Sequence, residues 1–220
     1  MTHSEKIFDE TIDFGPVVGF LHRPAATPQA GLVLTHGAGS NSLSPLLVAL
    51  AQAFCEVGWM VLRCDLPFRQ MWKTGPPRGS AVRDQQGLQA AVALLRRYTP
   101  APVFLGGHSY GGRMASMLAA DHPGLVENLL LLSYPLHPPK QPASLRTAHF
   151  PQLTTPALFV HGARDGFGTT EELEAALRLI PGRTELLSIP GAGHELMTRR
   201  NQEELPKTIV AAFQQFLSRD

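Results

Sequence analysis

Short apolar runs alternate along the chain with longer stretches in which apolar residues recur every three or four positions. Short aliphatic and aromatic runs bounded by turn residues are typical of buried strands. The wider spacing between them is typical of helices that bury one face. The strands that this pattern predicts cover residues 17–21, 31–35, 59–64, 102–106, 129–133, 157–161 and 184–189.

This alternation of strands and helices predicts a mostly parallel central sheet of about seven strands with helices on both faces. Ser44 is expected to cap the first helix, Pro45 to start it and Gly58 to stop it. Further helices are expected near residues 88–95, 113–120, 170–180 and 205–217. The length of the chain is ordinary for one α/β domain, so residues 1–220 are expected to form a single domain.

A Gly-His-Ser-Tyr-Gly sequence at residues 107–111 follows one predicted strand and precedes a helical stretch. It matches the pattern G-x-S-x-G, in which a serine lies in a tight turn between strand and helix. Gly107 and Gly111 let the two elements pass closely, and the turn holds Ser109 in a sparsely populated backbone conformation that exposes its Oγ. Ser109 is therefore the candidate nucleophile. The alternative is an incidental serine in a glycine-rich loop.

A carboxylate and a histidine follow Ser109 in the loops behind the last two predicted strands. Asp165 lies in the first of these loops and His194 in the second. A serine hydroxyl needs a base at neutral pH, and histidine titrates close enough to neutrality to take the proton and return it. Asp165 would hold the imidazole in the correct tautomer and stabilise its charged form. Glu171 and Glu172 are alternatives for the acid, but they fall inside the predicted helix that follows.

Two backbone N–H groups are candidates for an oxyanion hole. By position, one belongs to Tyr110, which follows the nucleophile. The His-Gly-Ala-Gly sequence at residues 36–39 follows the second predicted strand and supplies the other at Ala38, with Gly37 as the alternative. The loss of one such donor costs roughly 100-fold to 1000-fold in rate in a well-studied serine hydrolase. His36 is expected to orient the backbone of this loop and not to transfer protons.

The order Ser, Asp, His, together with both oxyanion segments, is that of α/β hydrolases. The chain resembles a small α/β hydrolase over nearly its whole length, from about the second predicted strand onward. Residues 36–39 and 106–118 are similar to those of dienelactone-hydrolase-like proteins and of the testis-expressed protein 30 type of hydrolase domain. The resemblance implies the α/β-hydrolase fold. Dienelactone hydrolases use a cysteine where this chain has Ser109, so their substrate is not expected here.

Two long connections border the predicted active site. Residues 135–156 occupy the place where larger α/β hydrolases insert a helical lid, but they contain six prolines. Proline breaks helices, so we expect no lid and at most a short helix near residues 144–149. Residues 65–80 contain aromatic and cationic side chains. These either line an acyl or anion pocket or form a surface loop anchored by Trp72, and both interpretations stay open.

These residues support the hypothesis of a lidless serine hydrolase that cleaves a small ester or thioester through an acyl-enzyme intermediate on Ser109. The same triad on this fold also supports perhydrolase or lyase chemistry without a cofactor, which is one alternative. The other is a catalytically weak binding or scaffold module, because the testis-expressed type resembles a domain in a subunit of a histone-acetyltransferase complex.

Composition narrows the partners and the location. A net charge of +1 with 17% charged residues gives no electrostatic reason to expect nucleic acid. No run approaches the ~20 apolar residues of a membrane span, and the polar residues 1–10 do not resemble a secretory signal, so a cytoplasmic protein without membrane contact is expected. Cys55 and Cys64 lack metal-ligand spacing and are expected to be buried thiols. No metal or cofactor is expected, and the oligomeric state stays open.

Overall fold

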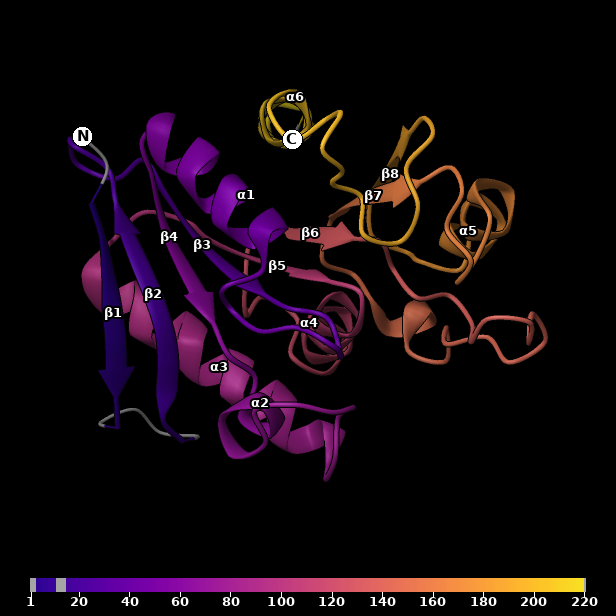
Figure 1. Cartoon of the computed structure of the whole chain (residues 1–220), viewed down its shortest axis with the longest axis horizontal. Coiled ribbons are helices and arrows are strands. Elements are labelled where there is room, and N and C mark those ends of the chain that lie inside the picture. The colour runs from indigo at the N-terminus through magenta and orange to yellow at the C-terminus, as the bar shows by residue number, and fades with distance from the viewer. Residues whose placement is uncertain (1–2, 11–14, 220) are drawn as a thin grey trace.

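One eight-stranded sheet forms the centre of the computed structural model, which describes residues 3–10 and 15–219 (Figure 1). The strands are β1 (His3–Asp9), β2 (Val17–Arg23), β3 (Ala30–Thr35), β4 (Trp59–Cys64), β5 (Val103–His108), β6 (Leu129–Leu132), β7 (Ala157–Gly162) and β8 (Thr184–Ile189). Their order in the sheet is β1-β2-β4-β3-β5-β6-β7-β8. β2 pairs antiparallel with β1 and with β4, and all other neighbours are parallel.

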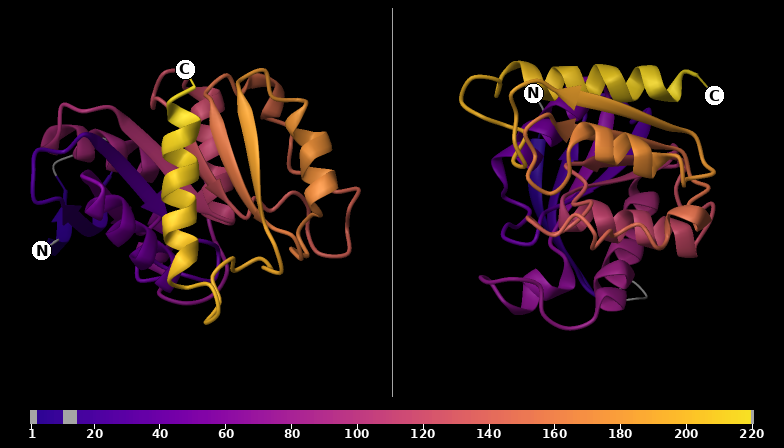
Figure 2. Two further views of the ribbon diagram at one scale, coloured as in Figure 1. Left: turned by 90° about the horizontal axis from the view of Figure 1, so that it is seen from above. Right: turned by 90° about the vertical axis from the view of Figure 1, so that its right-hand side faces the viewer.

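Helices cover both faces of the sheet (Figures 1 and 2). On one face lie α3 (Ala81–Tyr98), α4 (Tyr110–Asp121) and α5 (Thr170–Leu177). On the other face lie α1 (Pro45–Glu56) and α6 (Glu204–Leu217), which contact each other. The short helix α2 (Pro67–Met71) and the 3₁₀ helix η1 (Phe150–Gln152) lie within connections.

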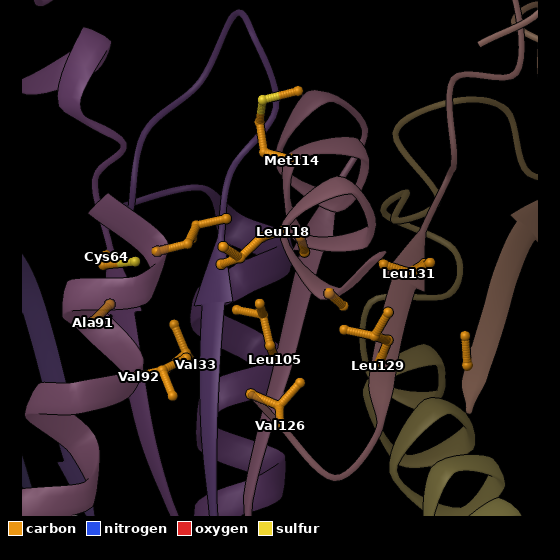
Figure 3. Packing of buried hydrophobic residues seen from close by; sticks show 14 of the residues in the cluster. Val33, Cys64, Ala91, Val92, Leu105, Met114, Leu118, Val126, Leu129 and Leu131 are labelled. Atoms are coloured by element: carbon orange, nitrogen blue, oxygen red, sulfur yellow. The ribbon is translucent and has the colours of Figure 1, made fainter. Parts of the chain in front are cut away.

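The core consists of two apolar layers, because successive side chains of a strand point to opposite faces of the sheet. In β5, Leu105 belongs to the layer under α3 and α4, whereas Phe104 belongs to the layer under α1 and α6. Phe104 packs edge to face on Phe213 of α6, with ring centroids 5.6 Å apart. Figure 3 shows the first layer, where Val92 of α3 and Leu118 of α4 lie against the strands. The side chains of the parallel strands are therefore buried on both faces of the sheet. The loops that follow the carboxyl ends of these strands lie together at one edge of the sheet.

The predicted fold is confirmed, and all seven predicted strands are present with small differences at their ends. The sequence pattern missed β1. This strand lies at the edge of the sheet, and among its described side chains only Ile7 is buried, so its sequence is mostly polar. The polar segment of residues 1–10, which does not resemble a secretory signal, is described only from residue 3 onward.

Three local expectations need correction. Ser44 precedes α1 as expected, but its side chain makes no capping hydrogen bond. α5 ends at Leu177 and not at residue 180. In the fully described connection between β6 and β7, the short helix is η1, which begins just after the predicted residues 144–149, and the connection contains no other helix. Cys55 and Cys64 are buried free thiols, as predicted.

Candidate active site

Ser109 lies in the turn between β5 and α4 with a left-handed backbone, at φ 52° and ψ −117°. A residue other than glycine rarely adopts this conformation, and it persists only where the surrounding structure enforces it. Close backbone packing enforces it here. A Cβ on Gly107 would lie 2.5 Å from the carbonyl carbon of Gly111, and a Cβ on Gly111 would lie 2.5 Å from the carbonyl oxygen of His36. The glycines of the motif therefore allow the turn, although Ser109 is only 8% exposed and not displayed on the surface as the sequence pattern predicted.

His194 lies between Ser109 and Asp165. Its Nε2 is 2.7 Å from Ser109 Oγ, and its Nδ1 is 2.8 Å from Asp165 Oδ2. A carboxylate only accepts hydrogen bonds, so Nδ1 carries the proton and Nε2 is free to accept the serine hydroxyl. The structure thus brings together the three side chains that the sequence singles out. The serine and the histidine are 85 residues apart in the sequence.

Two neighbours hold the His194 ring and its loop. The Phe167 ring stacks on the imidazole, with centroids 4.1 Å apart and an interplanar angle of 29°. His108 Nε2 donates a hydrogen bond of 2.8 Å to the carbonyl of His194. His108 is therefore not a rival base for Ser109. It ties the end of β5 to the loop that carries the histidine.

Asp165 is buried and stays ionised. Burial alone would raise the pKa of its carboxyl group, but hydrogen bonds from His194 and from the Phe167 N–H outweigh burial and lower it below the ordinary value. His161 lies on its other side, with Nδ1 3.9 Å from Asp165 Oδ2. His161 Nε2 donates to the carbonyl of Gly168, while its Nδ1 has no hydrogen-bond partner, so this histidine is only half satisfied.

The loop of residues 36–40 follows β3 and is held from within by His36. Its Nδ1 donates to the Gly37 carbonyl at 2.8 Å, and its Nε2 accepts the Leu66 N–H at 3.1 Å. Burial lowers the pKa of His36 from 6.5 to about 4, although the bond to Gly37 and the charge of Asp65 act in the opposite direction. The ring is therefore neutral near pH 7, and the expectation that it orients backbone is confirmed.

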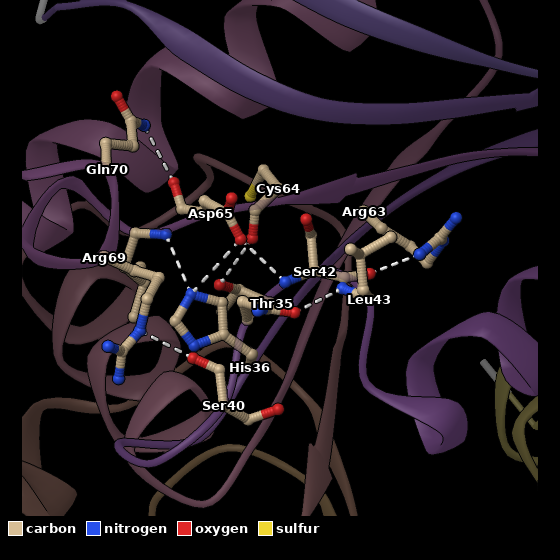
Figure 4. A network of polar contacts seen from close by, with 12 residues as sticks. Thr35, His36, Ser40, Ser42, Leu43, Arg63, Cys64, Asp65, Arg69 and Gln70 are labelled. Carbon is tan, nitrogen blue, oxygen red and sulfur yellow. Dashed lines mark hydrogen bonds and ion pairs between the residues drawn. The ribbon is translucent and has the colours of Figure 1, made fainter. Parts of the chain in front are cut away.

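Arg69 of α2 fastens the same loop from outside (Figure 4). Its guanidinium is buried and donates to four backbone carbonyls. Two of these belong to the loop, Ala38 at 2.7 Å and Ser40 at 2.8 Å. The other two are those of Trp72 and Gly75, both at 2.9 Å. One side chain thereby joins residues 36–40 to the connection after β4.

Ala38 and Tyr110 both lie at the site, in the loop after β3 and at the start of α4. Tyr110 is the first residue of α4, so its N–H has no acceptor within the helix. Its hydroxyl donates to Asp84 Oδ2 at 2.8 Å, which anchors the ring to α3. The Ala38 N–H donates no hydrogen bond to any described residue.

Comparison with known proteins gives the family. A family model described as an alpha/beta hydrolase domain matches residues 28–218. The chain belongs to the α/β-hydrolase family. The prediction of an enzyme of the α/β-hydrolase type is therefore confirmed.

Solved structures share this α/β-hydrolase fold at low sequence identity. An α/β serine hydrolase homologue from Coxiella burnetii superimposes with a TM-score of 0.77 at 20% identity, covering 96% of this chain and 98% of that one. An α/β serine hydrolase without a lid from Xanthomonas campestris gives 0.75 at 18% identity, with 99% and 94% covered. A dienelactone hydrolase from Anabaena variabilis gives 0.75 at 20% identity, with 97% and 98% covered.

Two curated relatives match part of this α/β hydrolase. Human monoglyceride lipase is 30% identical over 122 residues, which covers 50% of this chain and 37% of the lipase. A monoglyceride lipase homologue from monkeypox virus is 30% identical over 116 residues, which covers 50% of this chain and 40% of that protein. The chain therefore spans less than half the length of the curated relatives that it matches.

A cavity of about 710 Å³ opens at Ser109 in this α/β hydrolase. Its walls come from the loop after β3, the serine turn, the connection after β6 and the histidine loop. The lining residues are Gly37, Ala38, Gly39, Ser40, Ser44, Pro77, His108, Ser109, Tyr110, Arg113, Pro135, Arg146, Phe167, His194 and Glu195. From the connection of residues 65–80, only Pro77 reaches this cavity, whereas Trp72 packs against the core. The interpretation of that connection as an anchored surface segment fits better than that of an acyl pocket.

Sequence reasoning missed three supporting residues, namely Arg69, His108 and Phe167. Their roles depend on contacts with distant backbone or rings, for which one sequence carries no spacing signal. Within residues 3–10 and 15–219, no group of three or more His, Cys, Asp or Glu side chains is arranged to hold a metal ion. In the same residues, no helix combines the length and apolar character needed to cross a membrane.

Proposed function

We propose that this α/β hydrolase cleaves a small ester or thioester with Ser109 as nucleophile, His194 as general base and acid, and Asp165 as the residue that orients the histidine. The observation that carries the proposal is the pair of short contacts made by one imidazole, at 2.7 Å to Ser109 Oγ and 2.8 Å to Asp165 Oδ2. These distances are within the range expected for a nucleophile and its base. We also propose that residues 1–220 act as a single domain.

The reaction begins when Ser109 Oγ attacks the carbonyl carbon of the substrate while its proton moves to His194 Nε2. The negative charge of Asp165, next to Nδ1–H, stabilises the imidazolium that forms. Collapse of the tetrahedral intermediate breaks the bond to the alcohol or thiol, which takes the proton from Nε2. Water then attacks the acyl group on Ser109 with His194 as base, and the acid and the free serine are regenerated.

The tetrahedral oxyanion is stabilised by the N–H groups of Ala38 and Tyr110 in this proposal, with Gly37 as the alternative to Ala38. Two observations support the assignment. Both residues line the cavity at Ser109, and the Gly37 carbonyl, which shares a peptide with the Ala38 N–H, accepts hydrogen bonds from His36 Nδ1 and from the Ser40 N–H. Preorganised donors of this kind are effective because they do not reorient during the reaction.

Both the size of the cavity and the names of the relatives support a small ester as the substrate. A volume of about 710 Å³ is in the range of sites that enclose small ligands. The relatives that match half of the chain are named monoglyceride lipases, which supports ester cleavage as the reaction class.

Intact-mass labelling with a fluorophosphonate probe tests the nucleophile. We expect one adduct on the wild-type protein and none on Ser109→Ala or His194→Ala. Asp165→Asn should lower kcat for an activated ester by about 10⁴-fold, because the histidine then favours the wrong tautomer. Glu171→Gln is the matched control for the acid, since Glu171 is exposed on α5, and it should retain full activity. A folded wild-type protein without an adduct would instead support a binding or scaffold module.

A further inference from the structure

Two arginines line the cavity close to Ser109. Arg113 lies one turn into α4, and its N–H donates to the Ser109 carbonyl at 3.0 Å. The guanidinium of Arg113 lies beside the Tyr134 hydroxyl, which belongs to the connection after β6. Arg146 comes from the connection after β6, on another wall of the same cavity.

Two hydrogen bonds fix the backbone around Arg146. Its N–H donates to the Leu136 carbonyl at 2.8 Å, and its own carbonyl accepts the Tyr134 hydroxyl at 2.6 Å. The guanidinium donates one hydrogen bond, to the Pro135 carbonyl at 3.3 Å. Its remaining donors are not used by any described residue.

Neither guanidinium has a carboxylate partner in residues 3–10 and 15–219. The Nε of Arg113 is buried and has no hydrogen-bond partner there. Arg69, by contrast, satisfies its guanidinium with four carbonyls. The guanidinium of Arg69 thus makes four hydrogen bonds, whereas those of Arg113 and Arg146 have N–H groups without a described partner.

The two charges are also close enough to act on each other. Burial, and after it the positive charge of Arg113, lowers the pKa of Arg146. Two cations in a partly buried wall repel each other, and an anion between them would offset that cost. One carboxylate lines the cavity, that of Glu195, but it is exposed and pairs with neither arginine.

We propose that Arg113 and Arg146 form an anion subsite, so that the preferred substrate is an ester or thioester that also carries a carboxylate or similar oxyanion. A guanidinium presents paired N–H donors that match the two oxygens of such a group. The substrate preference rests on the proposed serine hydrolase, whereas binding of an anion by the two arginines does not require hydrolysis.

Hydrolysis of matched ester pairs tests the substrate preference. Mono-para-nitrophenyl succinate carries the anion on the acyl side, and para-acetoxybenzoate carries it on the leaving group. The methyl ester of each is the neutral control. We expect the wild-type enzyme to prefer the anionic member of at least one pair by about tenfold or more in kcat/KM, as loss of a charge-assisted hydrogen bond implies. The pair that shows the preference tells which side of the substrate faces the arginines.

Arg113→Gln and Arg146→Gln should each lower kcat/KM for the anionic esters far more than for the neutral esters, and so remove most of this preference. Arg146 lies in an irregular connection, so its variant should fold even if that of Arg113 does not, and Arg113→Lys should keep part of the preference. Arg178→Gln, at the exposed end of α5, is the matched control and should behave as wild type. Equal rates for both members of both pairs, with no effect of either arginine variant, would overturn the inference while leaving the proposed hydrolase intact.

Binding to Ser109→Ala separates the two proposals. Ligand-detected NMR should show monoethyl succinate binding more tightly than diethyl succinate, and Arg146→Gln in the same background should abolish the difference. Such binding in a protein whose wild type hydrolyses no ester would refute the proposed reaction but support the anion subsite. Equal binding of both compounds would refute the subsite.

Discussion

The loop of residues 36–40 and the connection of residues 133–156 border the same cavity, but they are held in different ways. The loop is fastened by buried polar side chains, since Arg69 binds the carbonyls of Ala38 and Ser40 and His36 bridges the loop to Leu66. The connection holds one 3₁₀ helix and is anchored by buried core side chains such as Phe150 and Leu153, with further support from the Tyr134 hydroxyl and from the contact between His149 and Ser116.

Under the two proposals, the loop and the connection have different roles. An oxyanion hole needs N–H groups that are fixed before the reaction, and such fixing requires bonds to the peptides themselves. A specificity wall needs a stable backbone, but its cavity-facing side chains can change without loss of the reaction. We therefore expect substitutions in the support of the loop to reduce kcat, and substitutions in the connection to change which substrate is preferred.

The largest effect should come from Arg69→Gln. Loss of the guanidinium releases the Ala38 and Ser40 carbonyls, which follow the Ala38 N–H in the chain, so the loop that presents this N–H is held less firmly. We expect kcat for a neutral ester to fall by about 100-fold or more with little change in KM, as for removal of an oxyanion donor. Buried carbonyls left without donors should also lower the free energy of unfolding by about 3 kcal/mol.

Steady-state kinetics and urea unfolding measure both effects of Arg69→Gln. Arg78→Gln is the matched control, because Arg78 is exposed in the same connection and does not line the cavity. A variant that raises KM and leaves kcat unchanged would show that Arg69 acts on substrate binding and not through the loop.

Acid should weaken the fastened loop, because His36 is held neutral. In the unfolded chain its pKa is near 6.5, whereas in the folded protein burial lowers the pKa to about 4. Between these values the unfolded state binds more protons, so stability is complete above pH 6.5, falls as the pH drops and levels off below about pH 4. His36 alone would account for a loss of about 3 kcal/mol.

Urea unfolding at several pH values measures this loss, and an NMR titration of the His36 ring assigns it to the residue. His22 and His149 also have pKa values lowered to about 4 by burial, so the total slope should exceed that of one group. His122→Gln is the matched control at an exposed position. A His36 ring that titrates near pH 6.5 in the folded protein would contradict the prediction.

Gly111→Ala tests the contact between the serine turn and the loop. The added methyl group would lie 2.5 Å from the His36 carbonyl oxygen and 2.6 Å from Thr35 Cγ2. Alanine favours a helix over glycine by about 1 kcal/mol, but this overlap should dominate and destabilise the fold by about 2 kcal/mol net. Thermal unfolding measures the change. Gly166→Ala, with open space around the new methyl group, should alter stability little, and equal effects of both substitutions would refute the packing argument.

Much of the site could be predicted from sequence because the positions of Ser109, Asp165 and His194 depend on local sequence patterns. The turn at Ser109 needs glycines at fixed positions, and Asp165 and His194 need only to follow two recognisable strands. The role of Arg69 could not be predicted, because it depends on carbonyls as far as 31 residues away. β1 was missed for another reason: an edge strand buries few side chains, so it shows little apolar pattern.

The smallest effect should come from Leu145→Ser in the connection. Leu145 is 53% exposed and does not line the cavity, although its neighbour Arg146 does. We expect a change in unfolding free energy within about 0.5 kcal/mol and unaltered hydrolysis of neutral and anionic esters. Urea unfolding and the ester pairs described above measure both. A loss of more than about 1 kcal/mol would mean that this connection is packed as firmly as the loop of residues 36–40, and the contrast between the two walls would then disappear.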